Sequence, residues 1–266
     1  MKKVARKGFG YYLTAKHVYQ AKYYLKSILS YKLSGIASLL APTTSRAPWG
    51  LLEMPRSFQR PPTEYDNQVY RLIRELAPQG VCIDAGSWVG DIAILMARTA
   101  RRVIALEPDR YNIRFLRKNI KLNNLEDIVE PLPCALSSKD GPTMLVTSSS
   151  SAGHSTNAGL GAYHYSVESI SINKLILEYL ANEKEIDLVE MDIQRAEFQI
   201  LPSADAEVFG RVKNWLVECH GVGKTKAEEE GMIEQLFKNY GYHIRWLEPP
   251  AVEDTGRHIY AYRSSS

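Results

Sequence analysis

Two acidic residues lie at the ends of successive apolar segments, and each is followed by a turn signal. Asp84 lies near the end of segment 81–85, and Glu107 ends segment 102–107, with a helical apolar pattern between them. In an open α/β sheet the carboxyl ends of neighbouring parallel strands form the ligand-binding edge, so we predict that these carboxylates share one site. Glu107 can accept two hydrogen bonds from a ribose diol, which indicates a nucleoside-containing ligand.

The glycine spacing after Asp84 indicates which ligand this is. Gly86 and Gly90 form a G-x-x-x-G pattern around Ser87, whereas the G-x-G-x-x-G of dinucleotide-binding proteins places a pyrophosphate at a helix N-terminus. The glycines would also let the backbone approach a ligand without a Cβ clash. S-adenosylmethionine fits this pattern, because it has a ribose, no phosphate, and an ammonium group that Asp84 would bind directly or through an ordered water. The alternative is that Asp84 and Glu107 only cap the helices that follow them.

Polar side chains also follow two later apolar segments. Asp192 follows segment 186–191, with Glu197 one turn further on, and His220 follows segment 214–219. We expect the two segments to be neighbouring strands, so Asp192, Glu197 and His220 should converge near a transferred methyl group. Methyl transfer to a hydroxyl needs alignment and removal of the hydroxyl proton, which a histidine with an ordinary pKa of about 6.5 can accept. Alternatively these side chains hold a divalent metal, or Glu197 and His220 only stabilise the ends of their elements.

The order of the predicted elements is typical of a doubly wound α/β domain. We predict a seven-stranded, Rossmann-like sheet of the class I methyltransferase type, with helices on both faces and a final antiparallel pair. The Ser- and Gly-rich stretch 137–165 interrupts this order and contains His154, a weaker candidate for the site. The predicted helices are 64–77, 89–100, 110–123, 172–182, 196–201 and 225–240, and the predicted strands are 81–85, 102–107, 128–136, 166–171, 186–191, 214–219, 242–247 and 257–263, with a short β run at 144–147.

The charge of the chain is distributed unevenly. Residues 1–60 contain eleven Lys or Arg and one acidic residue, whereas residues 61–266, the predicted S-adenosylmethionine-binding domain, are net acidic. We predict a basic amphipathic helical arm joined by a Pro-rich linker at 41–63. Residues 1–40 could contact an anionic membrane; packing on the domain or binding a polyanion are the alternatives. The apolar residues at helical spacing are Ala15, Val18, Ala21, Leu25, Ile28, Ile36 and Leu40.

The cysteines and the hydropathy indicate the compartment. The three cysteines, Cys82, Cys134 and Cys219, lie in apolar segments and form no C-x-x-C pair, which favours reduced thiols. The sequence has no apolar run of the ~18 residues that a membrane-spanning helix needs, and no clear signal peptide. We therefore expect a cytoplasmic protein that is peripheral at a membrane.

At these residues the sequence resembles the FkbM family of S-adenosylmethionine-dependent methyltransferases, over roughly residues 64–247. Segments 83–90 and 105–109 carry motifs common to many methyltransferases. Residues 186–197, Ile-Asp-Leu-Val-Glu-Met-Asp-Ile-Gln-Arg-Ala-Glu, are similar to the family's own I-D-L-x-K-x-D-x-E-G-A-E motif. Further similarity lies in Asn119-Ile120-Lys121-Leu122-Asn123, in Ala135-Leu136-Ser137 and in Glu218-Cys219-His220.

The resemblance implies O-methylation of a hydroxyl on a small-molecule, glycan or glycolipid acceptor. By position, it implies that Asp192, Glu197 and His220 act on the acceptor. It implies cofactor binding by Asp84, Gly86, Ser87, Gly90, Glu107, Ala135, Leu136 and Asp192.

The sequence departs from the family pattern at four positions. Gln194 and Arg195 replace the usual Glu and Gly, Glu190 replaces a common Lys, and Trp88 replaces a usual Asn. Loss of the carboxylate at position 194 argues against a bound metal, so we predict none. One alternative is a tRNA or RNA methyltransferase, although the N/D-P-P-Y/F turn of base amino methylation is missing and nucleic acid is the disfavoured partner. Another is a cofactor-binding module with weakened catalysis.

Overall fold

The computed structural model describes residues 29, 32–33, 43–47, 50–54, 64–147, 163–221, 226–247 and 256–264. Nearly all of the predicted basic arm lies outside the described residues, as do residues 148–162 with His154. In the described part of the chain, no helix has the length and apolarity needed to cross a membrane.

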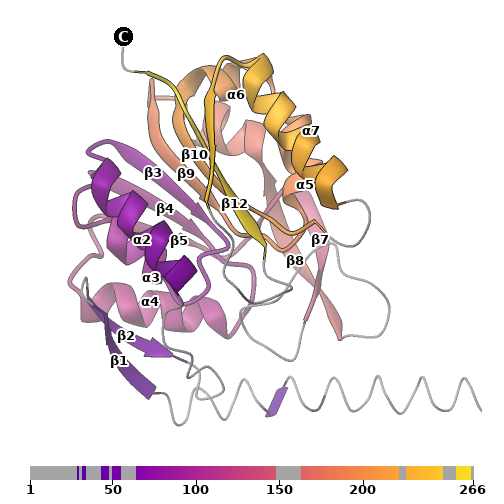
Figure 1. Ribbon diagram of the computed structural model, residues 1–266. Helices are drawn as coiled ribbons and strands as arrows, with labels where there is room; N and C mark the ends of the chain where they lie inside the picture. The colour runs from indigo at the N-terminus through magenta and orange to yellow at the C-terminus, as the bar shows by residue number, and fades with distance from the viewer. Residues whose placement is uncertain are drawn as a thin grey trace, which may run out of the picture.

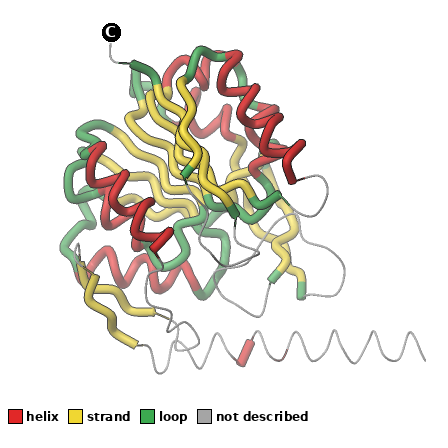
Figure 2. Tube along the Cα trace, viewed as in Figure 1, coloured by secondary structure: helices red, strands yellow, loops and turns green. Residues whose placement is uncertain are grey.

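A seven-stranded, mostly parallel sheet forms the centre of the molecule (Figures 1 and 2). Strand β3 pairs in parallel with β4 on one side and β9 on the other, while β12 is antiparallel to β10 and β11. The predicted fold class and the final antiparallel pair are confirmed. In order across the sheet the strands are β11 (His243–Trp246), β12 (Arg257–Tyr262), β10 (Val212–Cys219), β9 (Ile186–Met191), β3 (Val81–Ala85), β4 (Arg102–Leu106) and β5 (Val129–Leu132).

Helices cover both faces of this sheet, and successive strand residues pack into different cores. Cys82 faces one hydrophobic cluster with α2 (Glu64–Leu76), α3 (Asp91–Met96) and α4 (Asn112–Leu122), while Ile83 faces the other. This alternation follows from the two-residue period of a strand. The second cluster contains residues of α5 (Glu197–Ile200), α6 (Ala206–Arg211) and α7 (Lys226–Asn239), and of a π-helix at Lys174–Tyr179 within the predicted helix 172–182. The short helix α6 was not predicted.

A second sheet of three strands packs beside the first. Its strands are β6 (Ala135–Ser137), β8 (His164–Ser171) and β7 (Gly141–Val146). The prediction of one strand over 128–136 was therefore wrong, because β5 and β6 belong to different sheets. Pro133 has no backbone N–H for a strand ladder, and the Cys134 amide donates to the Leu132 carbonyl at 2.9 Å in a tight turn.

Part of the predicted Pro-rich linker forms a β-hairpin on α4. Strands β1 (Thr43–Ala47) and β2 (Gly50–Met54) pair antiparallel. Two asparagine side chains of α4 hold β2, because Asn123 exchanges hydrogen bonds with the backbone of Leu51, and Asn119 does the same with Glu53, at 2.7–3.1 Å. The prediction of an irregular linker was wrong over β1 and β2, because the two strands pair with each other and the Asn119 and Asn123 side chains bind the backbone of β2 as well.

Candidate active site at the carboxyl edge of the sheet

The turn after β3 is held by hydrogen bonds to β4 and to β3 itself. The Gly86 and Ser87 amides donate to the carbonyl oxygen of Leu106 at 3.0 Å, and the Ser87 hydroxyl donates to that of Asp84 at 2.8 Å. Asp84 and Glu107 thus lie at the ends of adjacent parallel strands, as predicted. The buried carboxylate of Asp109, rather than that of Glu107, accepts the first amides of α4.

Gly86 and Gly90 are required by contacts within the protein. Both have left-handed backbone conformations, with φ of 93° and 92°. A Cβ at Gly86 would lie 1.9 Å from the backbone oxygen of Asp192, and a Cβ at Gly90 would lie 2.4 Å from Leu116. We expected these glycines to allow close approach of a ligand. The geometry gives a different reason, because a Cβ at either position would overlap other atoms of the protein. Contact between their backbone and the cofactor stays a prediction.

Glu107 is buried and fixed by backbone amides. Its Oε2 accepts from Trp88 at 2.8 Å and its Oε1 accepts from Asp109 at 2.7 Å. Burial, together with the charge of Asp109, raises the pKa of Glu107 well above its ordinary value. The Trp88 and Asp109 amides and the Asn112 side chain occupy three of the four lone pairs of this carboxylate, so an acceptor direction remains for the ribose diol. Trp88 adopts φ of 46° at this turn, a conformation that an asparagine tolerates better.

Asp84 forms a buried pair of carboxyl groups with Glu190. The two residues are register partners on β3 and β9 and are 1% and 3% exposed. Burial and the neighbouring charge of Asp91 raise the pKa of Asp84 to about 7, and burial raises that of Glu190 well above its usual range. Among the described residues, Asp84 Oδ2 has no hydrogen-bond partner. This buried acceptor fits the ammonium of S-adenosylmethionine, so the residues present suit the predicted cofactor.

Asp192 lies directly beside the first turn. Its amide donates to the Ala85 carbonyl at 3.0 Å, and its own carbonyl covers Gly86. The predicted group around it does converge: His220 Nε2 lies 3.5 Å from Asp192 Oδ1, and His220 Nδ1 lies 3.4 Å from Glu197 Oε1. Glu197 is fully buried and also accepts the backbone amide of His220 at 2.7 Å.

Glu218 belongs to this cluster and was missed as a site residue. Its Oε1 lies 3.6 Å from His220 Nε2. The two residues are two positions apart on β10, so their side chains share one face of the strand, and this spacing was a usable signal in the sequence.

The carboxylates change the protonation of His220. Burial alone would lower its pKa, but the Glu197 carboxylate, followed by Asp192 and Glu218, raises it to about 9. The ordinary value of about 6.5 expected from the sequence was therefore wrong. At neutral pH the ring is an imidazolium, and burial raises the pKa of the neighbouring Glu218 well above its usual range.

The turn after Asp192 has an uncommon backbone. Gln194 and Arg195 have φ of 52° and 84°, values that glycine adopts without strain. The Gln194 amide nitrogen lies 2.9 Å from both Asp192 Oδ1 and His220 Nε2. Arg195 donates to the His220 carbonyl at 2.8 Å and forms an ion pair with Glu229 of α7 at 3.0 Å. These contacts hold the turn against β10 and α7.

Asp192, Glu218 and His220 are close enough to ligate one divalent ion, with their ligand atoms within 4.8 Å of one another. In this structure the Gln194 amide lies between two of them, because it donates to Asp192 Oδ1 and its nitrogen lies 2.9 Å from His220 Nε2. The absence of a metal stays a prediction.

Ala135 and Leu136 lie at the start of β6, near the end of β5. Both side chains are buried, Leu136 in the main core and Ala135 in a small cluster with Leu145 and Val167. The prediction that they border the cofactor's adenine remains untested.

The chain is similar to known methyltransferases in sequence and in fold. A family model described as a methyltransferase FkbM domain matches residues 82–244. Methyltransferase sdnD of Sordaria araneosa is 26% identical over 203 residues, which cover 65% of this chain and 77% of that protein.

Two solved structures illustrate the likeness in fold. A transferase of Pyrococcus horikoshii has a TM-score of 0.51 at 15% identity, with 83% of this chain and 70% of that chain covered. Methyltransferase FkbM of Methylobacillus flagellatus has a TM-score of 0.49 at 14% identity, with 70% of this chain and 44% of that chain covered. The family match spans most of the chain and includes every residue of the site described above, so the chain belongs to the FkbM methyltransferase family and is an S-adenosylmethionine-dependent methyltransferase.

Proposed function

We propose that this enzyme transfers a methyl group to a hydroxyl of a carbohydrate or glycolipid-type acceptor. The observation that carries the proposal is the group Asp192, Glu197, Glu218 and His220 beside the Gly86 turn. An oxygen nucleophile must lose a proton as the new bond forms, and this group supplies proton acceptors there. Carboxylates and an imidazolium also suit the hydroxyl groups of a sugar, which both donate and accept hydrogen bonds.

The residues divide into those that hold the donor and those that act on the acceptor. The bound cofactor supplies an electrophilic methyl group. Glu107 would accept the ribose hydroxyls, and the Asp84–Glu190 pair would bind the ammonium, which fixes the position of the methyl. Alignment of this kind contributes most of the rate in methyl transfer.

Asp192 is the proton acceptor that we propose for the hydroxyl. Its side chain is 35% exposed, whereas that of His220 is 15% exposed and carries a proton at neutral pH. Burial raises the pKa of Asp192, which makes the carboxylate a stronger base, and the adjacent His220 partly opposes that rise. His220 therefore acts in this proposal as the cation that keeps Asp192 ionised, a revision of its expected role as the base.

Labelled S-adenosylmethionine tests the acceptor class. The enzyme is incubated with separate glycan, lipid and RNA extracts, and the products are analysed by mass spectrometry, with the Asp192→Asn variant as the background. We expect a labelled methyl ether in the glycan or lipid fraction. Label confined to RNA would favour the second enzyme class, and tight cofactor binding with no label in any fraction would favour a non-catalytic module.

The basic N-terminal residues support a membrane partner. Residues 1–40 are strongly basic and carry apolar residues at helical spacing, which suits an anionic bilayer surface where lipid-linked acceptors reside. We propose a cytoplasmic enzyme that is peripheral at such a surface. Deletion of residues 1–40 should abolish binding to anionic liposomes and leave cofactor affinity unchanged; equal liposome binding by the truncated protein would reject this role.

A further inference from the structure

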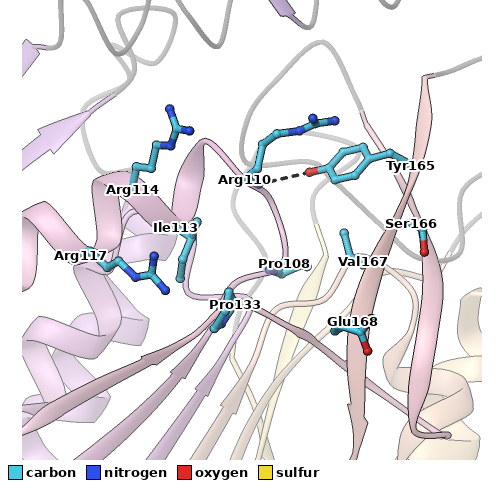
Figure 3. A pocket seen from close by; sticks show the side chains of 10 residues that line it. All are labelled: Pro108, Arg110, Ile113, Arg114, Arg117, Pro133, Tyr165, Ser166, Val167 and Glu168. Atoms are coloured by element: carbon cyan, nitrogen blue, oxygen red, sulfur yellow. Dashed lines mark hydrogen bonds between the residues drawn. The ribbon is translucent and has the colours of Figure 1, made fainter.

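A basic groove lies between α4 and β8, outside the edge strand β5 (Figure 3). It has a volume of about 430 Å³, within the range of small-molecule sites. Its apolar floor includes Pro108, Ile113 and Pro133. Three arginines and one acid line it, namely Arg110, Arg114, Arg117 and Glu168.

Two of the three arginines lie on one face of α4. Arg114 and Arg117 are three residues apart on this helix, and Arg110 lies in the turn that precedes it. Arg114 and Arg117 are exposed, and in the described part of the chain no hydrogen bond or ion pair engages their guanidinium groups. Three positive charges and one negative charge thus face a single groove, which favours an anionic ligand.

Arg110 is held in place by an aromatic side chain. Its guanidinium carbon lies 4.2 Å from the ring centroid of Tyr165, and the two groups lie together in Figure 3. The Tyr165 hydroxyl donates to Asp109 at 2.8 Å and accepts the Arg110 amide at 3.3 Å, while the Tyr165 ring stacks on Tyr163 at 5.9 Å. The Tyr165 ring holds the Arg110 guanidinium, and the buried Asp109 carboxylate holds the Tyr165 hydroxyl. Arg110 therefore loses little conformational entropy when it binds a ligand.

We propose that this groove binds a phosphate or diphosphate ester. The planar guanidinium fork matches phosphate oxygens in a bidentate way, and the apolar floor suits the face of an attached ring. Pro108, which lines the groove, directly follows Glu107 of the predicted ribose site in the chain. This inference goes beyond the proposed function, because the groove is separate from Asp192 and His220 and its ligand need not accept a methyl group.

Calorimetry with inorganic diphosphate at low ionic strength tests the groove directly. We expect binding by the wild-type protein and at least about a tenfold loss of affinity in Arg114→Gln/Arg117→Gln, since hydrogen bonds to charged groups are lost. Lys121→Gln on the same helix is the matched control, because Lys121 is exposed and does not line the groove. Glu168→Gln should bind diphosphate more tightly, since it removes the one opposing carboxylate. Thermal unfolding checks that each variant is folded.

Two further titrations distinguish a lipid headgroup from a free ester as the source of the phosphate. Phosphatidylcholine vesicles with and without phosphatidic acid are titrated with the wild-type protein and the double variant, and a loss of binding specific to phosphatidic acid would assign the groove to lipid headgroups. Diphosphate binding without that loss would assign it to a free ester. Absence of diphosphate binding, or equal binding by the double variant, would overturn the proposal. The proposal would also be overturned if diphosphate does not bind and single-stranded RNA binds through Arg114 and Arg117. That result would identify the groove as a nucleic-acid site.

Discussion

The side-chain amide nitrogen of Gln194 lies 2.9 Å from Nε2 of His220, in the position where the family commonly has a glutamate. The same nitrogen is 2.9 Å from Asp192 Oδ1, so one neutral amide joins the acid and the imidazole. A glutamate here would add a fourth carboxylate to a group that already includes Asp192, Glu197 and Glu218. The neutral Gln194 side chain therefore keeps the cluster less negative than a glutamate at this position would.

We expect methyl transfer by the wild-type enzyme to be insensitive to chelators. The Gln194→Glu variant should instead acquire affinity for Mn²⁺, because two carboxylates, a histidine and the new carboxylate suit a divalent ion. Calorimetry with Mn²⁺ measures this gain, and Gln194→Asn is the control without added charge. Wild-type activity that is lost on chelation and restored by Mg²⁺ or Mn²⁺ would contradict the predicted absence of a metal.

The pH dependence of the rate should identify the base. Asp192 must be ionised to accept a proton, and the His220 imidazolium favours that ionised form. The His220→Asn variant should therefore shift the acid limb of the kcat profile to higher pH. His220 itself titrates near pH 9 in the folded protein, so a wild-type rate that rises through pH 9, with that rise missing in His220→Asn, would show instead that His220 is the base.

Cofactor affinity should depend on both strand-end acids. Asp84→Ala or Glu107→Ala should weaken S-adenosylmethionine binding by at least about 1–2 kcal/mol, the order of a hydrogen bond to a charged group. Calorimetry measures this change, and unchanged affinity in both variants would contradict the assigned site. Glu75→Ala, a change at an exposed acid of α2, serves as the control.

The same affinity should rise with pH. Asp84 is protonated below its pKa of about 7 and ionised above it, and the ammonium prefers the ionised form. We expect tighter binding at pH 8 than at pH 6, and a smaller difference in Asp91→Asn, which removes the neighbouring charge that raises the pKa of Asp84. Affinity that is equal at the two pH values in the wild-type protein would mean that Asp84 does not bind the cation.

Two glycine substitutions should separate backbone strain from steric overlap. Gly86 and Gly141 have φ of 93° and 98°, but a Cβ at Gly86 meets the Asp192 oxygen at 1.9 Å, whereas a Cβ at Gly141 meets nothing within 4 Å. Gly141→Ala should cost about 1–2 kcal/mol in the free energy of unfolding, and Gly86→Ala about 3 kcal/mol or more. Urea denaturation measures both values. Equal losses would mean that β9 can move away from the turn.

The sequence by itself determined the sheet and the edge at which the site lies. Apolar segments ending in Asp84, Glu107, Asp192 and His220 predict strands, and parallel strands bring their carboxyl ends to one edge whatever the details of packing. The spacing of these residues was therefore sufficient to predict their convergence. The predictions were wrong for segment 128–136 and for the hairpin on α4. In both places the pairing of the strands depends on which distant segment of the chain packs beside them.

Only the tertiary structure decided the chemistry of individual side chains. The pKa of His220 near 9 requires three carboxylates from two strands and a helix, and the pairing of Asp84 with Glu190 requires the register of β3 with β9. The role of Gly86 depends on the path of β9, and the basic groove depends on how β8 packs against α4. Interactions between charges and contacts between surfaces depend on distances in space, and residues far apart in the chain acquire those distances only when the chain folds.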